Sequence, residues 1–226
     1  EEATAFQEES AKLKINILFH GTPGSLDEKY KSNPEKYKYY WDYITSEYHV
    51  MDYVKDVQLK LLVAAIKKQL GIEKVNVAVI TDVALWTEKI HSGWQEAVKK
   101  HPDANLVYVG KISRDAVDFT AELTELRSKN AQLIMAGMGY SAGYTFVKQA
   151  YDLQLPVLMS GLIALAWSAS DFLKAVGVDA AAYISSMGMM THPTTPTTAK
   201  KLKEYESQYG GEPHMCVGHA YNGVKA

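Results

Sequence analysis

Short apolar runs alternate with longer amphipathic segments along most of the chain. The apolar runs are rich in β-branched residues and predict buried strands at 14–20, 75–81, 105–111, 131–137, 155–161 and 181–187. Segments with apolar residues every three or four positions predict helices at 50–70, 86–100, 115–129, 142–153, 171–176 and 197–209. The alternation predicts an α/β fold, in which a parallel sheet lies between two layers of helices.

The helical spacing also predicts which side chains face the core. These are Val54, Val57, Leu61, Leu62 and Ala65, then Trp86, Ile90, Trp94 and Val98, and finally Phe119, Leu123 and Leu126. The stretch 21–48 lacks such a period. It is polar and aromatic, with breakers at Pro23, Gly24, Asn33 and Pro34. The aromatic run 37–53 is interpreted as a partly buried connection or interface.

Composition and charge narrow the function classes. The chain has 226 residues, of which 47% are hydrophobic, 24 are Lys or Arg and 26 are Asp or Glu. This balance excludes a disordered chain and gives no basic surface for nucleic acid. No apolar run reaches the roughly 20 residues of a membrane span. The single Cys216 cannot form an internal disulfide.

Ligands of parallel α/β sheets bind at the carboxyl ends of the strands. That rule selects 20–22, 81–86, 110–114, 137–143 and 160–162. These segments supply hydroxyl, backbone and aromatic groups, among them Thr22, Trp86, Tyr140 and Ser160, without acid–base machinery. Such groups are typical of a cleft that binds a ligand without transforming it.

One alternative is a serine hydrolase. Gly139–Gly143 fits G-x-S-x-G between a predicted strand and helix, which would make Ser141 a nucleophile, and His20-Gly21 is similar to an oxyanion loop. A triad also needs an acid and a histidine at later strand ends. The first later carboxylate after strand 155–161 is Asp171, and His192, His214 and His219 follow no clear strand.

Cofactor and metal sites are not expected. Gly137, Gly139 and Gly143 are spaced like a dinucleotide loop, but the next strand ends in Ser160-Gly161 without an acidic residue for a ribose. His214, Cys216 and His219 do not converge on one helix face, so they do not form a metal site.

Several segments together resemble type I periplasmic solute-binding proteins of ABC transporters, in the branched-chain amino-acid group. EKVNVAVITDVALWTEKIHSGWQEAVKKHPDANLVYVGKIS is similar to the opening of the family's second lobe, and DFTAELTELRSKNAQLIMAG and FVKQAYDLQLPVLMSG to its next units. INILFHGTPGSLDEKY and YYWDYITSEY resemble the end of the first lobe and the crossover, and EPHMCVGHAYNGVKA the returning helix. The order and spacing of these segments carry the resemblance.

The resemblance implies a three-layer α/β/α lobe of a two-lobe protein. Residues 1–47 would be the end of the first lobe and the crossover, 48–190 the second lobe, and 191–226 helices returning to the first lobe, with hinges near 44–50 and 186–193. The opening residues lack the features of a signal peptide, and HAYNGVKA stops inside a predicted helix. We therefore expect an excised piece of a longer protein.

The family's function implies a monomeric, non-enzymatic, extracytoplasmic component of an ABC importer. It would bind a hydrophobic amino acid or related carboxylate by hinge closure and present it to a membrane permease, in the periplasm or outside the cell, with an anchor in a preceding segment. No cofactor and no nucleic acid would take part. A ligand-sensing receptor domain of the same fold is a further alternative.

The resemblance also implies the binding residues. His20, Gly21 and Thr22 would contact the head group of the ligand, Trp86 would cap it, and Gly139 and Tyr140 would line the loop after the third second-lobe strand. Gly161 and Leu162 occupy the position where the family often has an acidic residue for the ligand ammonium. Leu162 departs from that pattern, which favours a more hydrophobic or carboxylate-type ligand.

Overall fold

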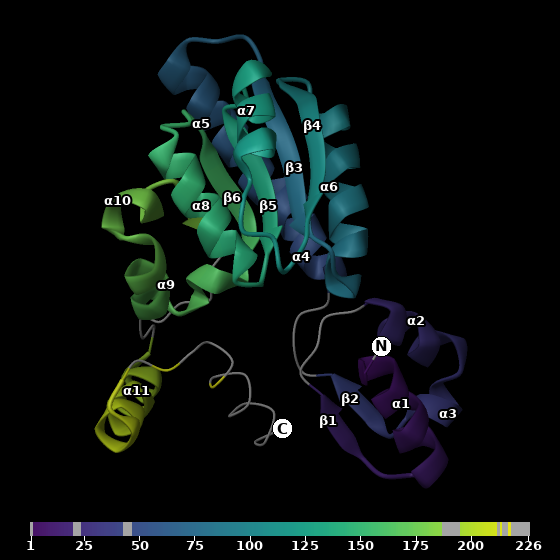
Figure 1. Cartoon of the computed structure of the whole chain (residues 1–226). Helices are drawn as coiled ribbons and strands as arrows, with labels where there is room; N and C mark the ends of the chain where they lie inside the picture. Colours follow the sequence, from purple (N-terminus) through teal and green to yellow (C-terminus); the bar gives the residue numbers. More distant parts are fainter. Residues whose placement is uncertain are drawn as a thin grey trace.

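A computed structural model describes residues 2–19, 24–42, 47–186 and 195–211, together with 213 and 217. Its largest unit is a five-stranded sheet in the order β4-β3-β5-β6-β7, and all four strand pairs are parallel (Figure 1). The strands are β3 (Val75–Asp82), β4 (Ala104–Ile112), β5 (Leu133–Met138), β6 (Leu158–Ile163) and β7 (Ile184–Ser186). The predicted α/β class and parallel sheet are confirmed.

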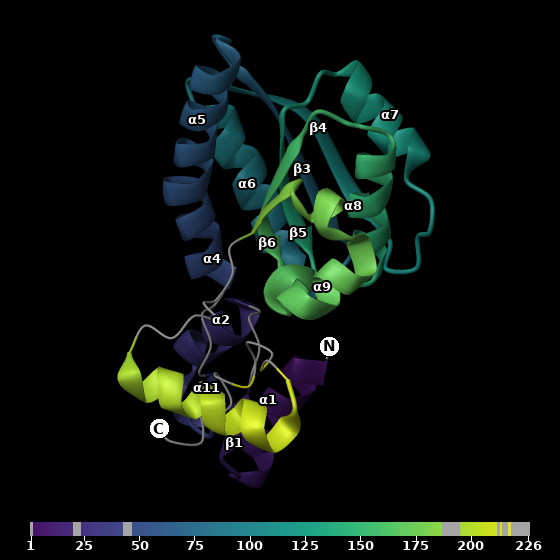
Figure 2. The same ribbon diagram turned by 90° about the vertical axis from the view of Figure 1, so that its left-hand side faces the viewer.

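Helices cover both faces of this sheet. One face packs against α7 (Thr120–Ser128), α8 (Ala142–Asp152), α9 (Ala169–Val176) and α10 (Val178–Ala181), and the other against α5 (Lys60–Leu70) and α6 (Glu88–Lys100) (Figure 2). The predicted core residues Phe119, Leu123 and Leu126 are buried on the first face. Ile90, Trp94 and Val98 are buried on the second, as their spacing predicts.

The predicted inner face of helix 50–70 is wrong in part. Val54 is buried, but Val57 is 38% exposed, Leu61 is 65% exposed and Ala65 is also exposed. The cause is a π-helix, η1 (Val54–Leu59), between α4 (Glu47–Tyr53) and α5. A π-turn bonds residues five apart, so it shifts the helical phase and brings Leu59 into the core.

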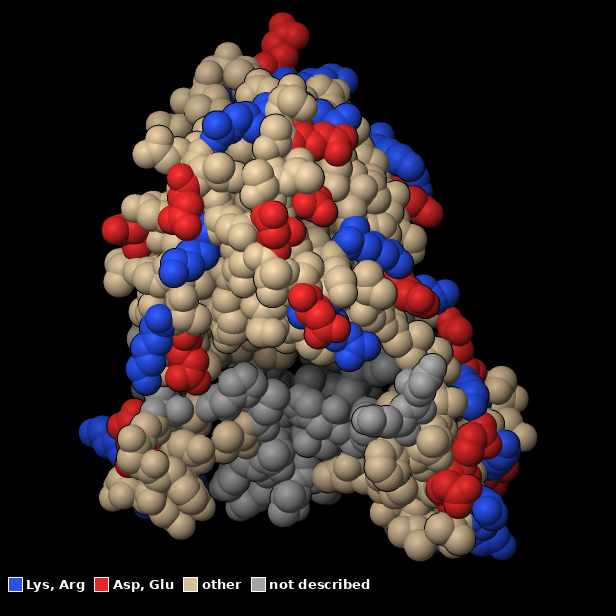
Figure 3. Space-filling model, in the orientation of Figure 1, with Lys and Arg blue, Asp and Glu red and all other residues tan. Residues whose placement is uncertain are grey.

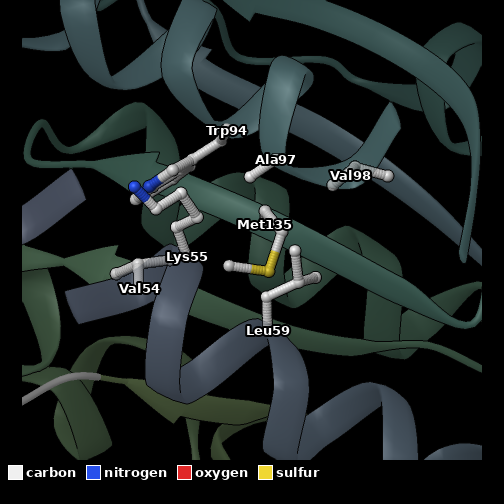
Figure 4. A pocket seen from close by; sticks show the side chains of 7 residues that line it. All are labelled: Val54, Lys55, Leu59, Trp94, Ala97, Val98 and Met135. Carbon is white, nitrogen blue, oxygen red and sulfur yellow. The ribbon is translucent and has the colours of Figure 1, made fainter. Parts of the chain in front are cut away.

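Figure 4 shows this packing from close by. Val54 and Leu59 of the π-helix lie beneath Trp94 and Val98 of α6 and Met135 of β5. All five side chains are at most 2% exposed. The π-helix therefore lets two residues five positions apart reach one apolar layer.

The polar stretch in which the sequence places breakers contains regular structure. Gly24–Ser32 forms α2, Pro34–Tyr37 forms α3, and Tyr40–Asp42 forms β2. The breakers mark helix starts here: the Asn33 side chain accepts the Lys36 backbone N–H at 3.1 Å, and Pro34 follows in the first turn, where its missing N–H has no cost. Residues that break a helix or strand in the sequence can therefore begin a helix as well as end one.

A second, two-stranded parallel sheet joins β1 (Ile17–Phe19) to β2. Helix α1 (Glu2–Leu13) is held to α2 and α3 by Glu8, whose carboxylate accepts from Lys29 Nζ at 2.6 Å, Lys36 Nζ at 2.8 Å and Tyr37 Oη at 2.8 Å. These hydrogen bonds lower the pKa of Glu8 to about 2. Glu8 therefore stays ionised and links three helices of the N-terminal segment.

The remaining elements are short or peripheral. They are the 3-10 turns η2 (Leu85–Thr87) and η3 (Ala164–Trp167) and the exposed helix α11 (Pro196–Tyr209). None of the helices in the described ranges has the length and apolar character needed to cross a membrane. On the face drawn in Figure 3, acidic and basic side chains are interspersed, as expected for a net charge of −2.

Gly161 in β6 is a position where the fold admits no side chain. Its φ is +127°, and a Cβ there would lie 2.6 Å from the Ala136 carbonyl oxygen and 2.9 Å from Trp94 Cη2. We expect Gly161→Ala to lower the free energy of unfolding by about 3 kcal/mol, from backbone strain together with overpacking. Urea denaturation monitored by tryptophan fluorescence measures the change.

Gly71→Ala is the matched control. Gly71 also has a positive φ, +65°, but no atom lies within 4 Å of its Cβ position. The Gly71→Ala substitution should lower the free energy of unfolding by only about 1 kcal/mol, because the conformational cost alone applies. Equal losses at both positions would contradict the argument from close packing.

Candidate functional site

Asp82 ends β3 at the carboxyl edge of the sheet and is fully buried. Its Oδ2 accepts the backbone N–H of Gly139 at 2.6 Å. Gly139 directly follows β5, so the bond ties the loop between β5 and α8 to the end of the neighbouring strand. The loop that carries Gly139 and Tyr140 is thereby held in one position.

The environment of Asp82 disfavours its charge. Burial raises the pKa of the carboxyl from 3.8 to about 6, although the backbone of Gly139 and of Tyr140 and the charge of Arg114 oppose the shift. Asp82 Oδ1 is buried and has no hydrogen-bond partner in the described part of the chain. One oxygen thus fixes the loop while the other adds to the cost of ionisation.

Trp86 lies in the turn η2 that follows β3. The turn is fixed by the buried Thr87, whose Oγ1 lies 2.7 Å from the Asp82 carbonyl oxygen and 2.8 Å from that of Ala84. A Cβ on Gly139 would be 3.1 Å from Trp86 Cζ2 and 3.8 Å from Ala164 Cβ. The half-buried indole therefore covers the Gly139 backbone, next to the start of η3.

Tyr140 follows Gly139 in the chain, and the cationic side chain of Arg114 lies over its ring. The Arg114 guanidinium carbon is 4.6 Å from the ring centroid, and Arg114 itself is exposed. Sequence reasoning examined 110–114 as a strand end but did not select Arg114, and it did not select Asp82. The strand-end rule places both correctly, and only their contacts across strands single them out.

Gly161 and Leu162 lie inside β6, which continues to Ile163. The sequence placed Leu162 just after the strand, and this was wrong because the apolar run continues past Gly161. Leu162 is 5% exposed and packs in the same apolar cluster as Trp86 and Trp167. The carboxyl edge of the sheet is therefore apolar on the side where Trp86, Leu162 and Trp167 lie.

Three of the predicted site residues come together, namely Trp86, Gly139 and Tyr140. Leu162 supports Trp86 from within the core, and Gly161 lies beside the β5 backbone. His20, Gly21 and Thr22 lie outside the described residues. The histidines and cysteine weighed as metal ligands or triad members, His192, His214, Cys216 and His219, also lie outside them.

The conformation of Ser141 does not fit a nucleophile elbow. An elbow holds its serine in a strained turn, whereas Ser141 has φ −54° and ψ −28°, which is relaxed helical backbone at the start of α8. Within the described residues, no group of three His, Cys, Asp or Glu side chains is placed to hold a metal ion. What the edge offers is an aromatic cover, backbone groups and one guanidinium.

The chain shares its fold with solved structures of several transporter proteins. LivJ of Streptococcus pneumoniae, in complex with isoleucine, is 17% identical with a TM-score of 0.75, over 99% of this chain and 59% of that one. A Thermus thermophilus branched-chain amino acid ABC transporter with bound valine is 16% identical, with a TM-score of 0.65, over 93% and 50%. An R. palustris solute-binding protein in complex with 4-hydroxybenzoate is 15% identical, with a TM-score of 0.72, over 99% and 57%.

The chain thus spans between 50% and 59% of the length of these three proteins. A search of curated protein sequences gave no match. The family model for periplasmic binding proteins matches residues 31–226, which is most of the chain. The match covers all five strands of the large sheet and the Trp86–Tyr140 edge, and the chain belongs to the periplasmic binding protein family.

Proposed function

We propose that the protein is the extracytoplasmic solute-binding component of an ABC importer and binds a small organic ligand at the carboxyl edge of the large sheet. The observation that carries the proposal is the contact of Trp86 with Gly139, beside Tyr140, at that edge. An aromatic side chain beside a half-buried loop backbone is suited to holding a ligand. The relaxed backbone of Ser141 gives no support to a catalytic alternative.

The chemistry of the edge favours a ligand with an apolar body. Trp86, Leu162 and Trp167 share one apolar cluster, so the wall beside the Gly139 loop is hydrophobic. We therefore propose a hydrophobic amino acid or a related carboxylate. His20, Gly21, Thr22, Gly161 and Leu162 remain part of the proposed site as well.

Ligand binding would close two lobes. We propose that residues 1–47 contribute the end of one lobe and the crossover, 48–190 the second lobe, and 191–226 the return to the first. The carboxyl ends of β3–β6 face the side where α1–α3 and α11 lie, which is the arrangement that closure needs (Figures 1 and 2). The closed form would be recognised by a membrane permease, in the periplasm or at the cell exterior.

The binding loop would be organised before the ligand arrives. Asp82 holds Gly139 through a bond of 2.6 Å, so little conformational entropy remains to be lost at this loop on binding. Its buried carboxyl has a pKa raised to about 6, which means that the folded protein is destabilised by the ionisation of this group.

Trp86→Ala should weaken binding of L-isoleucine or benzoate by about 1–3 kcal/mol, because it removes the aromatic cover of the Gly139 loop. Isothermal titration calorimetry of the full chain measures the affinity with each probe.

Tyr151→Ala is the matched control. Tyr151 is a partly exposed aromatic residue at the opposite end of α8, in edge contact with Tyr183, and its removal should leave both affinities unchanged. Unchanged affinity in the Trp86 variant would remove Trp86 from the site.

Asp82→Asn should change how stability depends on pH. Between about pH 4 and 6 the unfolded Asp82 loses its proton while the folded one keeps it, so the wild-type chain becomes less stable as pH rises through this window. The Asn variant lacks this loss. The stability difference, variant minus wild type, should therefore increase by about 2 kcal/mol between pH 4 and 7.

Urea denaturation at pH 4, 5, 6 and 7 gives this difference directly. Other titrating groups are common to both chains and cancel in the subtraction. Asn retains an oxygen that can accept the Gly139 N–H, so the loop keeps its anchor. A difference that is flat with pH would show that Asp82 titrates normally.

A further inference from the structure

Arg114 is exposed at the carboxyl edge of the sheet, two residues after the end of β4. It is one of two arginines in the chain. The other, Arg127, donates to the Leu153 carbonyl oxygen near the opposite end of α7 and α8 and thus has a structural role. The described residues contain neither a backbone acceptor for Arg114 nor a carboxylate in ion-pair contact with it.

The contact of Arg114 with Tyr140 positions a cation beside the binding loop. The guanidinium lies over the ring, with 4.6 Å from its carbon to the ring centroid. All five N–H donors of a guanidinium lie in its plane, so a group that meets a ring with its face keeps those donors for another partner. A carboxylate is the partner whose two oxygens match that fork.

The charges around Arg114 favour an anion at this point. Lys111 lies three residues earlier, at the end of the same strand. Asp115 is on the same loop and exposed, but it makes no ion pair with Arg114. Asp82 is fully buried and bonded to the Gly139 N–H. Its charge interacts with Arg114, but burial raises the pKa of Asp82 and disfavours its charged form.

Among the described residues that follow β6, no carboxylate is placed as a comparable partner for a ligand ammonium. Leu162 is buried and is followed by the apolar turn Ala164–Trp167. The next carboxylate, Asp171, accepts from Ser168 Oγ at 2.8 Å and pairs with Lys174. An ammonium placed against this wall would lose its hydration without gaining a counter-ion, which is unfavourable.

We propose that Arg114, stacked on Tyr140, binds the carboxylate of the ligand, and that the ligand is a small apolar monocarboxylate without an ammonium group. Its apolar body lies against Trp86 and its carboxylate meets the guanidinium fork. This inference rests on the proposed function and adds to it the ligand class and the residue that selects it. Arg114 is then the specificity-determining residue of this edge.

Two matched pairs of probes test the ligand class. Benzoate and benzamide differ in charge, and 4-methylpentanoate and L-leucine differ by the ammonium group. Calorimetry of the full wild-type chain should show that the first member of each pair binds at least 10-fold tighter than the second.

Two variants test the residue. Arg114→Gln should weaken benzoate and 4-methylpentanoate at least 10-fold and leave benzamide unchanged, so that the charge preference disappears. Arg114→Lys keeps the charge but loses the fork and should give an intermediate loss. Because Arg114 is exposed, both variants should fold, which thermal denaturation verifies.

Lys100→Gln is the control for net charge. Lys100 is exposed at the C-terminal end of α6, at the opposite end of the sheet, and pairs with Glu96 across one helical turn. Its replacement changes the net charge by the same amount and should alter benzoate affinity less than 2-fold. A loss equal to that of Arg114→Gln would mean that general electrostatics, not a specific contact, attracts the anion, and it would overturn the inference.

The failure of this inference is distinguishable from the failure of the proposed function. If L-leucine binds as tightly as 4-methylpentanoate, or if Arg114→Gln retains wild-type benzoate affinity, the inference is overturned. The function still stands in that case, provided that Trp86→Ala weakens the same probes. If none of the four probes binds to the wild-type chain, both are overturned.

Discussion

The hydrogen bond from the Gly139 N–H to Asp82 is the constraint on which the geometry of the carboxyl edge depends. It joins the end of β3 to the start of the loop after β5, two strands that are neighbours in the sheet. Trp86 covers that loop from one side and Arg114 meets it from another through Tyr140. Without this bond, the Gly139 loop would not be fixed to the end of β3, and Trp86, Tyr140 and Arg114 would not be held in defined positions relative to one another.

The acceptor of this bond is the Asp82 carboxyl, whose charged form is disfavoured by its surroundings. A buried carboxylate with one unpartnered oxygen is costly, and the raised pKa of Asp82 measures that cost. A neutral side chain could fill the same space. The chain nevertheless has an acid at this position. Unfavourable arrangements of this kind are concentrated at sites that position other groups.

Periodicity predicted the five strands of the large sheet well, most directly β3, β5 and β6, because buried parallel strands are continuous apolar runs. It failed for residues 24–37, where Gly24, Asn33 and Pro34 were interpreted as breakers but begin helices. It also could not predict that Arg114 meets Tyr140, since that contact depends on the order of strands in space. Trp86, Gly139 and Tyr140 could be selected because strand ends are visible in the sequence.

The π-helix at Val54–Leu59 fixes the rotation of one helical segment relative to the next. Through it, Met51 of α4 contacts Gly93 of α6 while Val63 of α5 faces the core of the sheet. A regular α-helix would turn one of these two contacts away by about 100°, the angle of a single residue. The length of this segment therefore sets the direction of the chain: losing or gaining one residue would redirect the whole connection that leads to the large sheet.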